Sequence, residues 1–213
     1  MRRNSSRSGK SPTLHTAIIG DVGGMWSKLA WDVDVCRDVQ TSYPNERQPL
    51  AYAAINVCIA AWSLQNWVNS AAARQARARG EKFDKAAYRS AILDAIPEQA
   101  MCEAIANTAK HAHHKDEVWP GGQARLEWQE GDEDAPPGFL LHYADGLSGG
   151  LAVNRFISLC DNWWAYLIAH GFADGVARTP EWQQNKLRRI FGATGDRILP
   201  PGAEPLSATD VEP

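Results

Sequence analysis

Polar side chains able to do acid, base or ligand chemistry are concentrated in the run from Glu103 to Lys115, which reads EAIANTAKHAHHK. A helix turns by about 100° per residue, so several of these side chains would share one side of it. The residues on that side are Glu103, Asn107, Lys110, His111 and His114. A carboxylate, an amide, an ammonium group and two imidazoles would thus form one polar stripe. Imidazole titrates near neutral pH, which suits it to proton transfer.

Two other interpretations of this polar stripe remain open. The solvated face of an ordinary amphipathic helix has the same pattern, and there Lys110 and the histidines would suit the negative end of the helix dipole. A weak alternative is a metal site made by His111, His114 and Glu103, since the two histidines are three residues apart. The spacing lacks the glutamate of a His-Glu-x-x-His motif, so we expect no metal and no other cofactor.

The composition is that of a folded protein without a strong global charge. Of its 213 residues, 44% are hydrophobic and nine are tryptophan, and the formal net charge is −3. Such a chain can bury a sizeable core. Any binding to nucleic acid would have to come from a local basic patch.

The cysteines and the hydropathy pattern indicate the compartment. The four cysteines lie in apolar helical patterns without Cys-x-x-Cys pairs, so we expect buried free thiols in a reducing environment. No stretch approaches eighteen uninterrupted apolar residues, and the basic start MRRNSSRSGKSP is not followed by an apolar segment. We therefore expect a cytoplasmic protein that does not engage a membrane.

Apolar residues at helical spacing predict a mainly α-helical chain. The predicted helices cover residues 25–39, 49–80, 83–95, 97–114, 150–167 and 179–191. The second of them ends in a solvated segment with Arg74, Arg77 and Arg79. Alternation in ARLEWQE and in FLLHY predicts two strands. The predicted fold class is mainly α, an antiparallel helical bundle with one small β-hairpin inserted before the last long helix.

The domain organisation follows from the same pattern. Residues 1–20 are predicted to be a disordered basic tail, and residues 193–213 a loose, Pro-rich acidic tail. Residues 21–192 are predicted to form a single helical domain. We find no internal repeat.

The order of these elements, together with Ala106, Asn107, Lys110 and His111, resembles the HEPN superfamily. The Trp-bearing helix INVCIAAWSLQNWV, the Asn-x-x-Lys-His core, a hairpin with an Asp-Gly turn and the helix RFISLCDNWWAYL carry the resemblance, which covers roughly residues 45–172. It implies a helical, dimeric protein. Many members of the family are metal-independent endoribonucleases of phage-defence or toxin–antitoxin systems.

The family's catalytic signature is an arginine followed four to six residues later by a histidine. Asn107 and His111 match this pattern, but Ala106 occupies the position of the arginine. The resemblance assigns catalysis to His111, with Asn107 orienting it and Lys110 supplying positive charge. Lysine lacks the planar bidentate fork of arginine, so Lys110 is not an equivalent replacement.

Because the arginine of the signature is absent at Ala106, more than one function remains open. The first is a HEPN-like protein that cleaves or binds RNA as a homodimer, with His111 of each protomer at a shared cleft. The second is a non-catalytic helical dimer or partner-binding module that uses the same polar stripe as an interface. A less favoured third possibility is base stacking on Trp119 or Trp128 of the hairpin.

Overall fold

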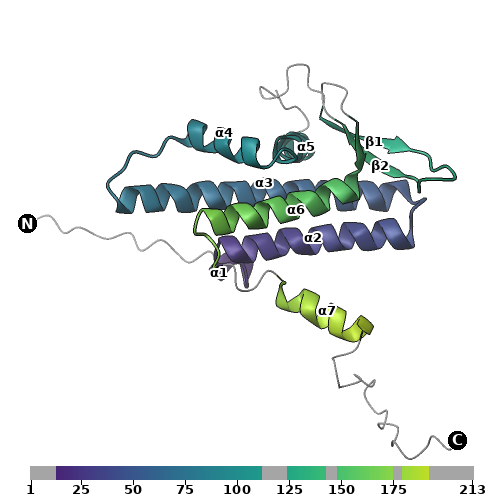
Figure 1. The fold of residues 1–213 in the computed structure, drawn as a ribbon, viewed down its shortest axis with the longest axis horizontal. Helices are drawn as coiled ribbons and strands as arrows, with labels where there is room; N and C mark the ends of the chain where they lie inside the picture. Colours follow the sequence, from purple (N-terminus) through teal and green to yellow (C-terminus); the bar gives the residue numbers. More distant parts are fainter. Residues whose placement is uncertain (1–12, 112–123, 143–147, 175–178, 192–213) are drawn as a thin grey trace, which may run out of the picture. The chain divides into compact units, whose positions relative to one another are not determined.

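The computed structural model describes residues 13–111, 124–142, 148–174 and 179–191 (Figure 1). Within these ranges the chain is mainly helical, with a small antiparallel sheet before the last long helix, which confirms the predicted fold class. The helices are α1 (Thr13–Thr16), α2 (Val22–Ser42), α3 (Arg47–Ala78), α4 (Lys85–Ala95), α5 (Gln99–His111), α6 (Ala152–Ala169) and α7 (Glu181–Phe191). The strands are β1 (Arg125–Gln129), β2 (Gly138–His142) and β3 (Ser148–Leu151).

The centre of the bundle is formed by α2, α3 and α6, which run side by side in Figure 1. At the start of α2, the Asp21 carboxylate accepts the Gly24 N–H at 2.8 Å and caps the helix. α3 has 32 residues, which corresponds to about 48 Å of helix. Its buried face is rich in alanine, so the neighbouring backbones can approach closely. α6 fills the space between them with the fully buried Phe156 and Trp163.

Two shorter helices, α4 and α5, contact α3. In Figure 1, α4 is drawn along the C-terminal half of α3, whereas α5 is seen end-on and therefore crosses α3 at a steep angle. The Asp84 carboxylate starts α4 by accepting the N–H groups of Ala86 and Ala87, both at 3.0 Å. This arrangement lets side chains of α3, α4 and α5 meet.

The predicted hairpin is present, but the sheet has a third strand that we did not predict. β1 pairs antiparallel with β2, and Trp128 lies opposite Phe139. β3 pairs antiparallel with the other edge of β2, where Leu151 lies opposite Leu140. The prediction of a helix from residue 150 was therefore wrong at its start, because this Gly-containing segment extends along β2. The Asp145–Gly146 turn lies outside the described residues.

The chain divides into two compact units, residues 1–174 and 175–213. The described part of the second unit includes α7. Pro180 directly precedes this helix, and its carbonyl accepts the N–H groups of Gln183 and Gln184 at 3.0 Å. The single domain over residues 21–192, with tails at 1–20 and 193–213, stays a prediction.

The structure bears on two predictions about the environment of the protein. All four cysteines are free and buried, as predicted. Along the described ranges, no helix has both the length and the apolar character needed to cross a bilayer. The cytoplasmic location stays a prediction.

Candidate functional site

The structure places the residues of the predicted polar stripe in different environments. Asn107 is buried, with 8% of its surface exposed, whereas Glu103 is half-buried and Lys110 is exposed. His111 ends α5, but its side chain lies outside what the structure describes, and so does the whole of His114. The interpretation of the stripe as a solvated helix face was wrong at Asn107, because the part of α5 that carries Asn107 packs across α3.

Ala106, which the proposed resemblance aligns with the arginine of the HEPN signature, is completely buried at 0% exposed surface. Ala104, on the same helix, is also buried. A guanidinium at position 106 would have to enter this packed region and lose its hydration, which is costly without a buried partner. An alanine at position 106 thus fits the packing of α5.

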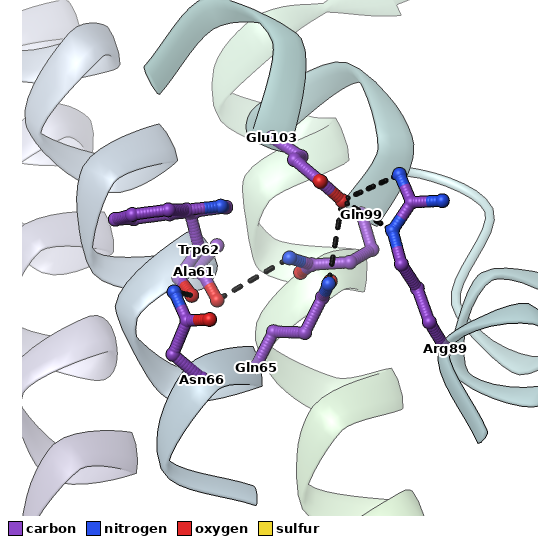
Figure 2. Close-up of polar contacts among 7 residues, drawn as sticks. All are labelled: Ala61, Trp62, Gln65, Asn66, Arg89, Gln99 and Glu103. Carbon is purple, nitrogen blue, oxygen red and sulfur yellow. Dashed lines mark hydrogen bonds and ion pairs between the residues drawn. The ribbon is translucent and has the colours of Figure 1, made fainter. Parts of the chain in front are cut away.

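Glu103 forms the centre of a cluster that joins three helices (Figure 2). Its Oε2 accepts hydrogen bonds from Arg89 Nε at 3.2 Å and from Arg89 Nη2 at 3.0 Å. The same oxygen accepts a third bond from Gln65 Nε2 at 3.3 Å. Since Arg89 lies on α4 and Gln65 on α3, the carboxylate ties both helices to α5. Its charge is balanced by the guanidinium, so Glu103 is committed to structure rather than to a metal.

Lys110 lies over an aromatic ring of α3. Its Nζ is 3.9 Å from the centroid of the Trp62 ring, a distance typical of a cation–π contact. Trp62 is half-buried and Lys110 is exposed, so the pair remains partly accessible to solvent. The contact holds the Lys110 charge against α3.

A second network lies deeper, where Gln99 connects three helices. Trp163 Nε1 on α6 donates to Gln99 Oε1 at 2.8 Å. Gln99 Nε2 donates to the Ala61 carbonyl of α3 at 3.3 Å, the bond drawn in Figure 2. The Gln99 side chain is completely buried. Buried polar groups need such partners, so this network fixes where α5 starts relative to α3 and α6. We refer to Trp62, Gln65, Gln99, Glu103 and Lys110 as the α3–α5 seam.

Sequence reasoning missed Gln65, Arg89 and Gln99. Gln65 did carry a signal, because it is a polar residue between Leu64 and Val68 in an otherwise apolar part of α3. Arg89 carried none, since nothing in the sequence shows that α4 folds back towards α5. Buried polar residues within apolar stretches are the signal that could have identified this seam.

The described residues do not support the metal alternative. Within the described ranges, no group of three or more His, Cys, Asp or Glu side chains could hold a metal ion. The set of His111, His114 and Glu103 extends beyond those ranges. Of its three members, Glu103 is engaged by Arg89.

Burial raises the pKa of two of the buried thiols, Cys36 on α2 and Cys58 on α3. Burial raises the pKa of the Cys36 thiol to about 11. Burial also raises the pKa of Cys58 well above its usual value, and the neighbouring Cys102 thiol adds to this effect. Cys36 and Cys58 are therefore protonated at neutral pH and poor nucleophiles.

A local basic patch lies at the end of α3 and continues through the turn into α4. Residues 74–89, which we call the basic turn, contain six Lys or Arg and two acidic residues, a formal net charge of +4 in a chain of net charge −3. The exposed cations are Arg74, Arg77, Arg79, Lys82 and Lys85. The predicted solvation of Arg74, Arg77 and Arg79 is confirmed. A local cluster of exposed cations such as the basic turn is what the binding of a polyanion requires.

Comparisons of the chain with protein-family models, with curated proteins and with solved structures give no match. The fold and the site define a helical bundle with a polar seam between helices and a basic turn at one end. The resemblance to HEPN proteins rests on the motif and on the order of elements.

Proposed function

We propose that this chain is a HEPN-like helical protein that binds RNA through the basic turn and does not cleave it. The observation that carries the proposal is the burial of both Ala106 and Asn107, the positions at which the HEPN signature has its arginine and the residue after it. Catalysis on RNA needs a proton-transfer group and a cation that can reach the same phosphate.

The cations near the polar stripe are already engaged. Arg89 is paired with Glu103, and Lys110 lies over the Trp62 ring. A phosphate would have to break these contacts before either charge could stabilise a transition state. The arrangement therefore supports a protein that kept the helical framework without the cleavage chemistry.

RNA is the polyanion that best suits the basic turn within this proposal. Neutralising phosphates releases condensed counterions, so affinity for RNA should depend steeply on salt. For about four phosphate contacts on a single strand, affinity should fall on the order of tens-fold between 50 mM and 200 mM salt. Fluorescence anisotropy with a labelled RNA measures this directly.

A charge reversal in the basic turn provides the specific test. The double variant Arg77→Glu, Lys82→Glu should bind RNA at least tenfold more weakly, because two favourable phosphate contacts become repulsive. The matched control is Arg47→Glu, Arg125→Glu, which changes the charge equally at two arginines that are each 60% exposed and lie outside the basic turn. No binding at 50 mM salt, or equal losses in both double variants, would contradict the proposal.

Cleavage is tested separately. Purified protein in large excess should leave total RNA and tRNA intact, with or without EDTA. Cleavage that disappears in His111→Ala would establish an active ribonuclease and overturn the non-catalytic part of the proposal. A homodimer, a protein partner and a phage-defence or toxin–antitoxin setting remain predictions drawn from the resemblance.

A further inference from the structure

A surface pocket of about 510 Å³ lies between the basic turn and the residues after α6. It is formed by the end of α3, the turn into α4, one side of α4 and the residues that follow α6. Its aromatic lining residues are Phe83, Tyr88, His170 and Phe172. Pockets that bind small molecules or single groups of a larger ligand have volumes of about 300–1,000 Å³.

Two helix ends of the same type build this pocket. α3 and α6 both end in a left-handed glycine, Gly80 with φ 72° and Gly171 with φ 69°. After Gly171, the Phe172 N–H returns to the Leu167 carbonyl at 2.8 Å, and after Gly80 the Glu81 N–H returns to the Ala76 carbonyl at 2.9 Å. These bonds are typical of Schellman motifs. They turn the chain sharply and fix the backbone of Phe172 and Glu81 at the pocket.

The rings in and below the pocket are already ordered by contacts with each other. The centroids of Phe83 and Tyr88 are 5.2 Å apart. His170 stacks on Tyr166 with centroids 4.0 Å apart and an interplanar angle of 28°. Because His170 is exposed while Tyr166 is buried, only one face of the imidazole is covered by this stack. A flat ring can be added without reorganising the others.

The acidic groups of the pocket are occupied by protein partners. Both carboxylate oxygens of Glu81 accept the Arg79 Nε at 2.9 Å, and Asp84 accepts the N–H groups that begin α4. Lys82 is exposed and also lines the pocket. The pocket thus combines aromatic rings with an accessible cation inside a segment of net positive charge.

We infer that this pocket receives an unpaired base of single-stranded RNA, with Lys82 and the neighbouring arginines on the adjoining phosphates. The inference rests on the proposed RNA binding and specifies which form of RNA is bound and where. Stacking of a base on aromatic side chains is possible for any base, but only when the base is not paired. The pocket therefore selects single strands over duplexes and shows little preference for sequence.

The test compares three RNAs of equal length by fluorescence anisotropy at 50 mM salt: a 12-nucleotide single strand, its duplex, and an abasic strand that has the phosphates without the bases. We expect the single strand to bind roughly tenfold more tightly than the abasic strand. In the variant His170→Ala, Phe172→Ala, the single strand should bind no better than the abasic strand. Binding of the abasic strand itself should not change.

Tyr52→Ala is the control variant, because Tyr52 is an exposed aromatic residue of α3 that does not line the pocket. It should leave all three affinities unchanged, and circular dichroism should show that both variants are folded. If the single and abasic strands bind equally, or if the pocket variant retains the preference for bases, the inference is wrong while RNA binding by the basic turn stands. If none of the RNAs binds, both proposals fail together.

Discussion

The guanidinium of Arg89 donates through Nε and Nη2 to a single oxygen of Glu103, at 3.2 and 3.0 Å, and so joins α4 to α5 across 14 positions of sequence. The two side chains are 31% and 18% exposed. This partial burial reduces the screening by solvent that makes most surface ion pairs weak. The pair is a polar link between α4 and α5.

A double-mutant cycle with Arg89→Ala and Glu103→Ala should give a coupling energy of about 1 kcal/mol in the free energy of unfolding, measured by urea denaturation. The control is the same cycle on Arg47 and Glu130, which also form an ion pair but are 60% and 71% exposed. There the coupling should be close to zero. A coupling of equal size in both cycles would show that burial does not matter here.

Gln99→Ala should destabilise the protein by about 3 kcal/mol. The change removes the acceptor of the buried Trp163 N–H and the donor to the Ala61 carbonyl, and it leaves a cavity. Gln48→Ala serves as the control, since Gln48 is exposed and its side chain donates to Tyr52 of the same helix. Its effect should stay within about 0.5 kcal/mol. Thermal or urea unfolding measures both, and a small effect of Gln99→Ala would disprove the structural role of this network.

Gly171→Ala should cost about 1 kcal/mol of stability through the backbone alone. The left-handed φ of 69° is unfavourable for alanine, yet a Cβ at this position would meet no atom within 4 Å. Gly150→Ala is matched to it, because a Cβ there is equally free of contacts and the backbone has no positive φ. It should be neutral or slightly stabilising. Equal changes in melting temperature would refute the assignment of the effect to φ.

Because burial raises the pKa of the Cys36 thiol, we expect the folded protein to lose stability at alkaline pH. Its pKa is about 11 in the folded protein, above the value of an unfolded thiol. As pH rises, the thiol therefore ionises first in the unfolded state. The stability that this group contributes is fully present below about pH 8. Above that pH it decreases by up to about 1.4 kcal/mol per pH unit, until the thiol of the folded protein also ionises. Urea midpoints at pH 8 and pH 10.5 should differ less in Cys36→Ala than in wild type.

Val33→Ala provides the comparison for the alkaline experiment, since Val33 is buried on the same helix and does not titrate. It should lower stability equally at both pH values. If Cys36→Ala shows the same pH dependence as wild type and Val33→Ala, then another group causes the alkaline loss.

The helices could be predicted from sequence because each has apolar residues at helical spacing. The predicted helix 25–39 lies within α2, and the predicted helix 49–80 overlaps nearly all of α3. β3 could not be predicted, because residues 148–151 include two glycines and join the sheet through backbone pairing with β2. No side-chain periodicity marks such a strand.

The candidate site was less predictable than the fold. The polar side of α5 gives the same pattern whether it faces water or another helix, and only the steep crossing over α3 decides that Asn107 is buried. Similarly, the pocket of the basic turn combines residues 72–91 with residues 170–172, which are far apart in sequence. Tertiary contacts, not local spacing, determine both features.

The length of α3 has an electrostatic consequence. At the start of this helix, Arg47 pairs with Glu130, beside an exposed loop that also contains Asp132, Glu133 and Asp134. The basic turn lies at the other end, about 48 Å away, which is several Debye lengths at physiological ionic strength. An approaching polyanion is therefore repelled at one end and attracted at the other. For the RNA binding that we propose, this charge separation would orient the protein before contact. Added salt should then slow association more than it speeds dissociation.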